Sequence, residues 1–264
     1  MRLPVFHVDA FTAQVFHGNS AAVCLLDSWL DDRPLEKVAR ESNLSATAFL
    51  VTRENSLDLR WFTPRREIRL CGHATLATAH LIFTVLRPDL DEVHFTTRFS
   101  GVLTARKEGK RVAMDFPAFA PERRASVPRD LPRALDLEQP PSEVLEANDT
   151  WIAVLDGPEI VRSIRPDFSR LEKLHPHAVI VTAPGDDSDF VSRYFAPGYG
   201  VPEDPVTGSA HCSLTPYWSQ RLGKSQLHAR QLSERGGELW CELVGGRVLL
   251  KGNAVVTMQG SLTI

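Results

Sequence analysis

The stretch LCGHATLATAH, residues 70–80, places a thiol, a glycine and an imidazole side by side where an apolar helix is expected to begin. A histidine such as His73 has a pKa close to neutrality and suits general acid–base chemistry. Cys71 could be a base or a nucleophile, because the N-terminus of a helix lowers the pKa of a thiol. The structural alternatives are a histidine satisfied by local hydrogen bonds and a cysteine that acts as a small buried hydrophobe.

A second stretch, PEDPVTGSAH, has the same layout later in the chain. Gly208 opens an expected helix, and Asp204 precedes it as a second candidate acid–base group. The alternative for Asp204 is a turn aspartate before a proline, and the alternative for Ser209 is a plain N-cap. His211 and Cys212 lie farther into the helix, and we interpret them as structural.

These two stretches belong to a longer internal match. RWFTP begins at Arg60 and RYFAP at Arg193, and each is followed by a turn and then by a glycine that opens a helix. Arg193 lies 133 residues after Arg60, whereas Gly208 lies 136 residues after Gly72, so an insertion of three residues in GYGVPEDPV accounts for the difference. Such short matches can arise by chance, but together they favour a duplicated lobe.

Paired helix starts have a chemical use. A helix N-terminus carries unpaired N–H groups and the positive end of the helix dipole, so it attracts a carboxylate or an oxyanion. If a pseudo-twofold axis relates the lobes, the starts at Gly72 and His73 and at Gly208 and Ser209 can point at one cleft, where glycine lets a ligand approach the backbone closely. Such a site could hold an anionic substrate and stabilise an enolate-like charge beside it.

Composition limits the classes of partner. The chain has 264 residues, of which 43% are hydrophobic and 24% charged, and its formal net charge is −3. No basic field results, so neither nucleic acid nor a membrane is expected as a partner. The four cysteines form no metal-ligand pattern, so no metal site is expected and a reduced environment is the simpler interpretation. The N-terminal residues lack the apolar core of a signal peptide, and we expect the cytoplasm.

The elements that must position these residues are mostly short strands, separated by Gly, Pro, Asn and charged residues. Two helices interrupt the strands of the first half. DDRPLEKVARES has Leu35, Val38 and Ala39 at helical spacing, and the apolar side chains from Ala74 to Val85 surround the axis, which predicts a helix enclosed by protein. Gly223 is expected to cap a matching helix in the second half.

The predicted fold is α+β, with two pseudo-symmetric lobes that are each a mainly antiparallel, barrel-like sheet around a central helix. Residues 117–141 are rich in proline and charge, which predicts a connection between the lobes. We expect an N-terminal lobe over residues 1–117, which the C-terminal strand could complete, a connection over 118–146 and a C-terminal lobe over 147–264.

Several ordered motifs resemble one known family. They are DAFT followed by F.GN.AAV, NLS.TAF, RWFTP..E..LCGHATLATAH and RYFAP..GV.EDPVTGSAH. From Leu3 to the C-terminus the chain resembles the PhzF-like isomerases of phenazine biosynthesis, which are related to diaminopimelate epimerase and proline racemase. The resemblance implies a diaminopimelate epimerase-like fold with the ligand between two lobes, and acid–base isomerisation of a small anionic metabolite without metal or organic cofactor. It also implies a homodimer.

The resemblance assigns the site residue by residue. It matches His73 and Asp204 to the catalytic groups of the family. The candidates for substrate binding are Gly72, His73, Gly208, Ser209, Ser45, Asn19 and Cys71.

One catalytic position departs from the family pattern. The family stretch reads Asn-Leu-Ser-Glu-Thr, with the glutamate as proton shuttle, whereas NLSATAF has Ala46 there. Alanine cannot carry a proton. Ser20 likewise replaces the proline usual after Gly-Asn, which is a milder change.

Three hypotheses follow. The leading one is a PhzF-like, cofactor-independent isomerase that is weakened or rewired at Ala46. The alternative is a protein that binds a metabolite or another protein on the same fold without the chemistry. A cysteine hydrolase built on Cys71 and His73 is the third and weakest, because neighbouring side chains at a helix start are expected to diverge. Epimerisation by two cysteines is not expected, because Thr207 stands where the second thiol would be needed.

Overall fold

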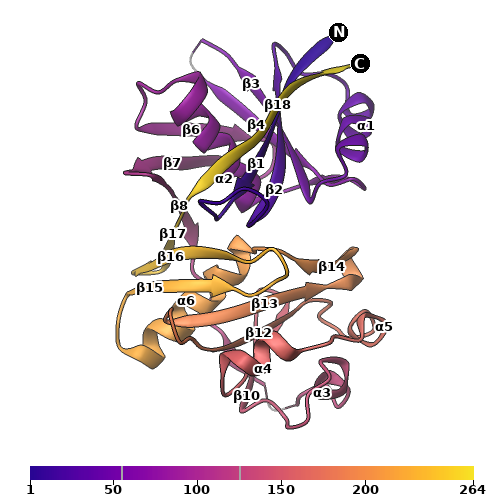
Figure 1. Ribbon diagram of the computed structural model, residues 1–264, viewed down its shortest axis with the longest axis vertical. Helices are drawn as coiled ribbons and strands as arrows, with labels where there is room; N and C mark the ends of the chain where they lie inside the picture. Colours follow the sequence, from indigo (N-terminus) through magenta and orange to yellow (C-terminus); the bar gives the residue numbers. More distant parts are fainter. Residues whose placement is uncertain (55, 125) are drawn as a thin grey trace. The chain divides into compact units, whose positions relative to one another are not determined.

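A computed structural model of the protein describes residues 1–264 except residues 55 and 125. The chain folds into two units (Figure 1): unit 1 comprises Met1–Asp115 and Lys251–Ile264, and unit 2 comprises Phe116–Leu250. The chain passes from unit 1 to unit 2 within strand β8 (Arg111–Pro117) and returns within strand β17 (Arg247–Gly252).

Unit 1 is a mixed sheet with one helix outside it and one inside it. Strand β1 pairs antiparallel with β2 and with β18, β2 pairs parallel with β3, and β4 pairs parallel with β6. Parallel neighbours need a crossover connection, which helices α1 and α2 supply here. The strands are β1 (Arg2–Ala10), β2 (Asn19–Leu26), β3 (Ala46–Thr52), β4 (Leu57–Phe62), β5 (Glu67–Ile68), β6 (Glu92–Thr97), β7 (Val102–Glu108) and β18 (Ala254–Thr263).

Helix α1 (Asp32–Ser42) buries Leu35, Val38 and Ala39, as its apolar spacing predicts. These side chains pack with Phe49 and Phe62 of the sheet in one hydrophobic cluster. The helix ends where Asn43 adopts a left-handed backbone at φ 47°, a conformation that asparagine tolerates better than most residues.

Helix α2 (Gly72–Leu81) is the enclosed helix that the sequence predicts. Nearly every side chain from His73 to Leu81 is buried, and the helix contacts β1, β2, β3, β7 and β18. The enclosed stretch is shorter than expected, because the chain continues from Ile82 to Leu86 as a π-helical turn (η1) and Val85 is 46% exposed there. A π-helical turn is wider than an α-helical turn, so the side chain of Val85 no longer faces the apolar residues that enclose α2.

Unit 2 repeats this plan. Strand β11 pairs parallel with β12, and β13 pairs parallel with β15 across helix α6 (Gly208–Leu222), which Gly223 caps at φ 68° as predicted. The remaining elements are β9 (Glu122–Arg123), α3 (Leu131–Ala134), β10 (Glu143–Ala147), β11 (Thr150–Val154), α4 (Pro158–Ser163), α5 (Phe168–Leu171), β12 (Val179–Pro184), β13 (Phe190–Ala196), η2 (Pro197–Tyr199), β14 (Val201–Asp204), β15 (Gln226–Gln231) and β16 (Gly237–Val244).

The internal repeat is also seen in the register of the paired strands. Phe62 faces Thr47 on one side and Glu67 on the other, and Phe195 faces Val179 and Glu203 in the same way. Phe62 and Glu67 are separated by four residues, whereas the segment between Phe195 and Glu203 has seven, residues 196–202. The three extra residues therefore lie within the segment that includes η2, where the sequence comparison places the insertion.

The division of the chain differs from the expected boundaries. Residues 118–146 belong to unit 2, because β10 pairs with β11 and the buried residues Leu131 and Leu135 join the core cluster of that unit. Residue 125, which falls in the expected connection, lies outside the described residues. Residues 251–264 belong to unit 1, where β18 pairs with β1.

Across residues 1–54, 56–124 and 126–264, the structure contains no helix with the length and apolar character needed to cross a membrane.

Candidate functional site

In unit 1 a polar cluster lies at the start of helix α2. The hydroxyl of Ser45, the residue before β3, is 2.6 Å from Asn19 Oδ1, 2.9 Å from the carbonyl oxygen of Ser20 and 3.1 Å from His73 Nε2. Asn19 is fully buried and His73 is 8% exposed. The structure thus brings three sequence-predicted site residues into one hydrogen-bonded group.

A hydrogen count assigns the histidine tautomer. Ser45 has one hydroxyl proton, and the two oxygens of Asn19 and Ser20 can only accept it. The Ser45 oxygen therefore accepts from an Nε2–H of His73, so Nδ1 of the neutral ring carries the lone pair. Burial lowers the pKa of His73 from 6.5 to about 4, which corrects the expectation of a pKa near neutrality and makes the neutral ring the dominant form at pH 7.

Cys71 contacts this imidazole. Its Sγ lies 3.5 Å from His73 Nδ1, so the two side chains converge, contrary to the expected divergence. The reason is the extended backbone of Cys71 at the N-cap (φ −143°, ψ 103°), which turns its side chain over the first turn of the helix, where N-cap side chains commonly reach. Cys71 is 7% exposed, and Gly72 beside it is partly buried.

Ala46, at the position where the resemblance implies a glutamate, is the first residue of β3 and is fully buried. It directly follows Ser45 and faces Ala21 of β2. A methyl group therefore stands next to the Ser45–His73 pair.

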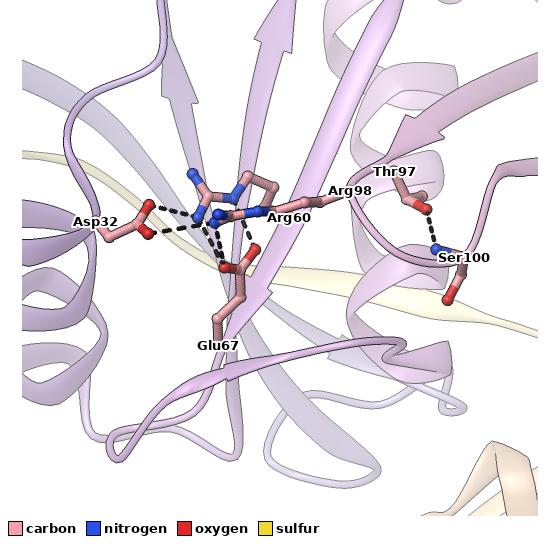
Figure 2. Close-up of polar contacts among 6 residues, drawn as sticks. All are labelled: Asp32, Arg60, Glu67, Thr97, Arg98 and Ser100. Atoms are coloured by element: carbon pink, nitrogen blue, oxygen red, sulfur yellow. Dashed lines mark hydrogen bonds and ion pairs between the residues drawn. The ribbon is translucent and has the colours of Figure 1, made fainter.

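A network of ion pairs holds the segment that leads into helix α2 (Figure 2). Arg60 on β4 donates from Nε and Nη2 to the two carboxylate oxygens of Glu67 on β5, at 2.7 and 2.8 Å, and from Nη2 to Asp32 at 2.6 Å. Arg98 donates to Asp32 at 3.2 Å and to Glu67 at 2.9 Å. The turn that carries Arg98 is closed by the Ser100 N–H, which donates to Thr97 Oγ1 at 2.9 Å. Because β5 ends four residues before Gly72, this network fixes the approach to the helix start.

In unit 2 a second polar cluster lies at the start of helix α6. Thr207 Oγ1 donates to Asp204 Oδ2 at 2.6 Å, and the Thr207 N–H donates to Gln231 Oε1 at 2.8 Å. The amide of Gln231 donates in turn to the carbonyl oxygen of Asp204 at 2.7 Å. The carboxylate of Asp204 is thus held in a fixed position beside the first turn of the helix.

The N-terminus of helix α6 has no side-chain cap for its backbone N–H groups. The side chain of the N-cap residue Thr207 makes no capping hydrogen bond, and the first turn carries no acidic residue. Ser209 is exposed, whereas Gly208 is buried. The backbone N–H groups of Gly208 and Ser209 begin the helix and have no intrahelical acceptor, which is the arrangement that binds anions.

An arginine–glutamate fork also recurs in unit 2. Arg193 on β13 donates from Nε and Nη2 to the two carboxylate oxygens of Glu203 on β14, at 2.7 and 2.9 Å. Its Nη1 donates to the carbonyl oxygens of Val161 and Ile164, at 3.2 and 2.9 Å. Successive side chains of a strand point to opposite faces, so the fork on Glu203 directs the next residue, Asp204, to the other face of β14.

Sequence reasoning missed two polar residues of these clusters. Asp9, 2% exposed, accepts from the Phe16 N–H at 2.7 Å and from the Ser20 hydroxyl, and so orders the loop before Asn19. Gln231, 1% exposed, joins Asp204 to Thr207 across more than twenty intervening residues. For Asp9 the available signal was a carboxylate in the mostly apolar strand β1, because a buried polar residue has to find a partner. Strand β15 contains several polar residues, so its sequence gives no such signal for Gln231.

A family model described as phenazine biosynthesis-like protein matches residues 8–260. The chain belongs to this family. An uncharacterized isomerase of Pseudomonas aeruginosa is 49% identical over 264 residues, and the match covers 100% of both chains. The crystal structure of a phenazine biosynthesis protein of the PhzF family from Enterococcus faecalis matches with a TM-score of 0.95 and 44% identity, and covers 100% of both chains.

A more distant match shows the fold alone. A predicted epimerase from Pseudomonas aeruginosa has a TM-score of 0.73 and 23% identity, with 99% of each chain covered. The predicted epimerase-like α+β fold is therefore confirmed, and the chain is a phenazine biosynthesis-like protein whose relatives include proteins named isomerases.

Proposed function

We propose that this phenazine biosynthesis-like protein is a cofactor-independent isomerase that moves a proton on a small carboxylate metabolite. The observation that carries the proposal is the neutral imidazole of His73 at the start of a buried helix. Its Nε2 is held by Ser45 at 3.1 Å, and its Nδ1 carries the lone pair. An oriented, neutral imidazole can both take and return a proton.

The proposed step uses the groups already described. Nδ1 of His73 or the carboxylate of Asp204 removes a proton from carbon, and the electron pair of the broken C–H bond passes into the substrate as an enolate-like charge. The group that received the proton returns it to a different carbon. The N–H groups at Gly72 and His73, or those at Gly208 and Ser209, bind the substrate carboxylate and stabilise the developing charge.

Because Ala46 cannot carry a proton, the proposed reaction has one acid–base group fewer than the family pattern implies. In the family pattern a glutamate follows the serine of the NLS motif, and here a buried methyl group follows Ser45. His73 and Asp204 are therefore the acid–base groups of the proposed reaction, and we expect slow turnover.

Incubation in heavy water with a panel of small carboxylates tests the proposal. We expect the wild-type protein to place deuterium on carbon in at least one compound and His73→Ala to do so at least about 100-fold more slowly. His94→Ala is the matched control, because His94 is an exposed histidine of the same unit. Equal uptake by wild type and His73→Ala across the panel would reject the proposal.

A second candidate function is a silent binding protein, and the buried Ala46 favours it. In that case the wild-type protein binds a carboxylate without exchange, and Ala46→Glu creates exchange with the same ligand. Turnover by the wild-type protein would exclude this candidate.

A further inference from the structure

Gln231, the last residue of β15, is a buried polar residue to which the proposed reaction gives no role. It is 1% exposed. Its Oε1 accepts from the Thr207 N–H at 2.8 Å, and its Nε2 donates to the carbonyl oxygen of Asp204 at 2.7 Å and to Thr207 Oγ1 at 3.2 Å. Each of these hydrogen bonds is made to the segment that leads into helix α6.

A hydrogen count fixes the direction of the bonds in this group. A backbone N–H can only donate, so the atom that faces the Thr207 N–H is Oε1, and the NH₂ group of Gln231 faces Thr207 Oγ1. An NH₂ group cannot accept, so the single hydroxyl proton of Thr207 points to Asp204 Oδ2, 2.6 Å away. A hydrogen bond donated to a carboxylate favours its charged form.

The three side chains differ in their access to solvent. Gln231 is 1% exposed and Thr207 is 7% exposed, whereas Asp204 is partly exposed. A substrate can therefore reach Asp204, while the buried amide of Gln231 can act on a reaction only through Thr207 and Asp204.

The sheet brings the ends of two strands together at this point. Strand β12 pairs with β13 along one edge, so β14 and β15 share the other edge. Asp204, the last residue of β14, lies opposite Tyr194, and Gln231 lies opposite Ser192. The register of β13 therefore sets the meeting of Asp204 and Gln231.

The internal repeat gives the counterparts of this pair in unit 1, which are Ile68 and Thr97. Ile68 lies opposite the residue that follows the fork arginine of unit 1, as Asp204 does in unit 2. Thr97 lies opposite the residue that precedes this arginine, as Gln231 does in unit 2. The positions are thus equivalent, but the side chains differ.

Unit 1 forms the same strand arrangement without such a link. Ile68 has no carboxylate, and the Thr97 hydroxyl donates to the carbonyl oxygen of Gly101 at 2.8 Å and accepts from the Ser100 N–H, both within its own turn (Figure 2). The fold therefore does not require a glutamine at this place. In unit 2 the glutamine occurs together with the carboxylate that it helps to hold.

We propose that Gln231 is a positioning residue, which orients the Thr207 hydroxyl and so holds Asp204 as the ionised proton acceptor of the reaction. This inference rests on the proposed function and assigns one of its roles. Asp204 takes the proton from the substrate carbon, the electron pair of the C–H bond stays on the substrate, and the resulting carboxyl group returns the proton to a different carbon.

The titration of the Asp204 side-chain carboxyl, followed by carbon-13 NMR of the full-length protein, tests the proposal. Thr207→Val keeps the backbone hydrogen bond to Gln231 but removes the hydroxyl, and we expect the titration midpoint to move to higher pH by about one unit. Thr207→Ser should restore the wild-type midpoint. Gln231→Met leaves the hydroxyl unoriented and should move the midpoint in the same direction by at least about 0.3 unit, a twofold change in the protonation constant.

Gln226→Met is the matched control, because Gln226 is an exposed glutamine at the other end of β15 whose amide donates to Glu242 at 3.3 Å. It should leave the Asp204 midpoint unchanged. An unchanged midpoint in Thr207→Val or in Gln231→Met would overturn the proposal, as would an equal movement in Gln226→Met.

The pH dependence of deuterium uptake connects this titration to the reaction. If Asp204 is the proton acceptor, the acid limb of the uptake rate should move with the carboxyl midpoint in Thr207→Val. A limb that stays in place while the midpoint moves would overturn the assigned role. Absence of uptake by the wild type across the panel would reject the proposed function, and the midpoints would still decide whether Gln231 controls Asp204.

Discussion

At the residue scale, the protonation of His73 is set by its surroundings more than by its type. The ring is nearly enclosed, and desolvation penalises the imidazolium, so the pKa falls to about 4. Ser45 cannot donate to Nε2 while it donates to a neighbouring carbonyl oxygen, which leaves Nδ1 as the basic atom. A residue whose type suggests titration near neutrality is therefore a neutral base at physiological pH.

A single substitution at Ala46 can restore a carboxylate next to Ser45. Ala46→Glu adds a proton-carrying carboxylate next to Ser45, and we expect it to raise deuterium exchange into the substrate about 100-fold or more, because a positioned general acid–base group contributes about that much. Ala46→Gln is the control of equal size that carries no proton, and it should leave exchange at the wild-type level. Exchange raised equally by both variants would show that side-chain size is responsible.

At the element scale, the duplicated arginine–glutamate fork links a strand to the approach of each central helix. Arg60 with Glu67 and Arg193 with Glu203 have the same two-bond geometry, and the glutamate precedes the helix-opening glycine by five residues in both units. Two parallel N–H···O bonds fix direction as well as distance, which a single bond to lysine cannot do. The forks thus position the segments that carry the candidate site residues.

Removal of one fork partner should be costly, because it leaves a largely buried charge unpaired. We expect Arg193→Met to lower the free energy of unfolding by about 3–5 kcal/mol, and the double variant with Glu203→Met to recover part of that loss. Chemical denaturation measures both. Arg162→Met removes the exposed ion pair with Glu159 and should cost less than about 1 kcal/mol. An equal cost for Arg193→Met and Arg162→Met would contradict a structural role of the fork.

Much of the arrangement of strands and central helices in the two units can be predicted from the sequence. The match of RWFTP to RYFAP locates equivalent strands, and the spacing of the glycines places three extra residues in the segment that holds Tyr199. Contacts between distant residues cannot be predicted in this way. Gln231 reaches Asp204 only because β15 and β14 both pair with β13, and no local pattern encodes that meeting.

At the scale of the whole molecule, each unit buries a neutral histidine in its central helix. His73 is 8% exposed, His211 is fully buried, and burial lowers the pKa of each from 6.5 to about 4. His211 donates from Nδ1 to the carbonyl oxygen of Thr207 at 2.8 Å, which suits the neutral ring. The unfolded chain binds a proton at each position from about pH 6.5 downward, whereas the folded chain does not until about pH 4.

Stability should therefore be fully present above about pH 6.5 and fall as the pH drops from 6.5 to 4. At pH 5 the expected loss is on the order of 2 kcal/mol per histidine, since each unit of pKa shift corresponds to 1.36 kcal/mol. Urea denaturation at pH 7.5 and pH 5 measures it. His211→Gln should reduce the pH-dependent loss by about 2 kcal/mol, and the exposed-residue control His94→Gln should not. An equal free energy of unfolding at the two pH values would contradict the burial of neutral histidines.

The central proposal is that the reaction requires both His73 and Asp204 as proton-transfer groups. Deuterium uptake from heavy water into the best carboxylate of the panel tests it in the wild type, His73→Ala, Asp204→Asn and the double variant. Groups that act as a unit are not additive, so we predict that each single variant loses about as much rate as the double variant. Losses that multiply in the double variant, or a single variant with the wild-type rate, would contradict the claim.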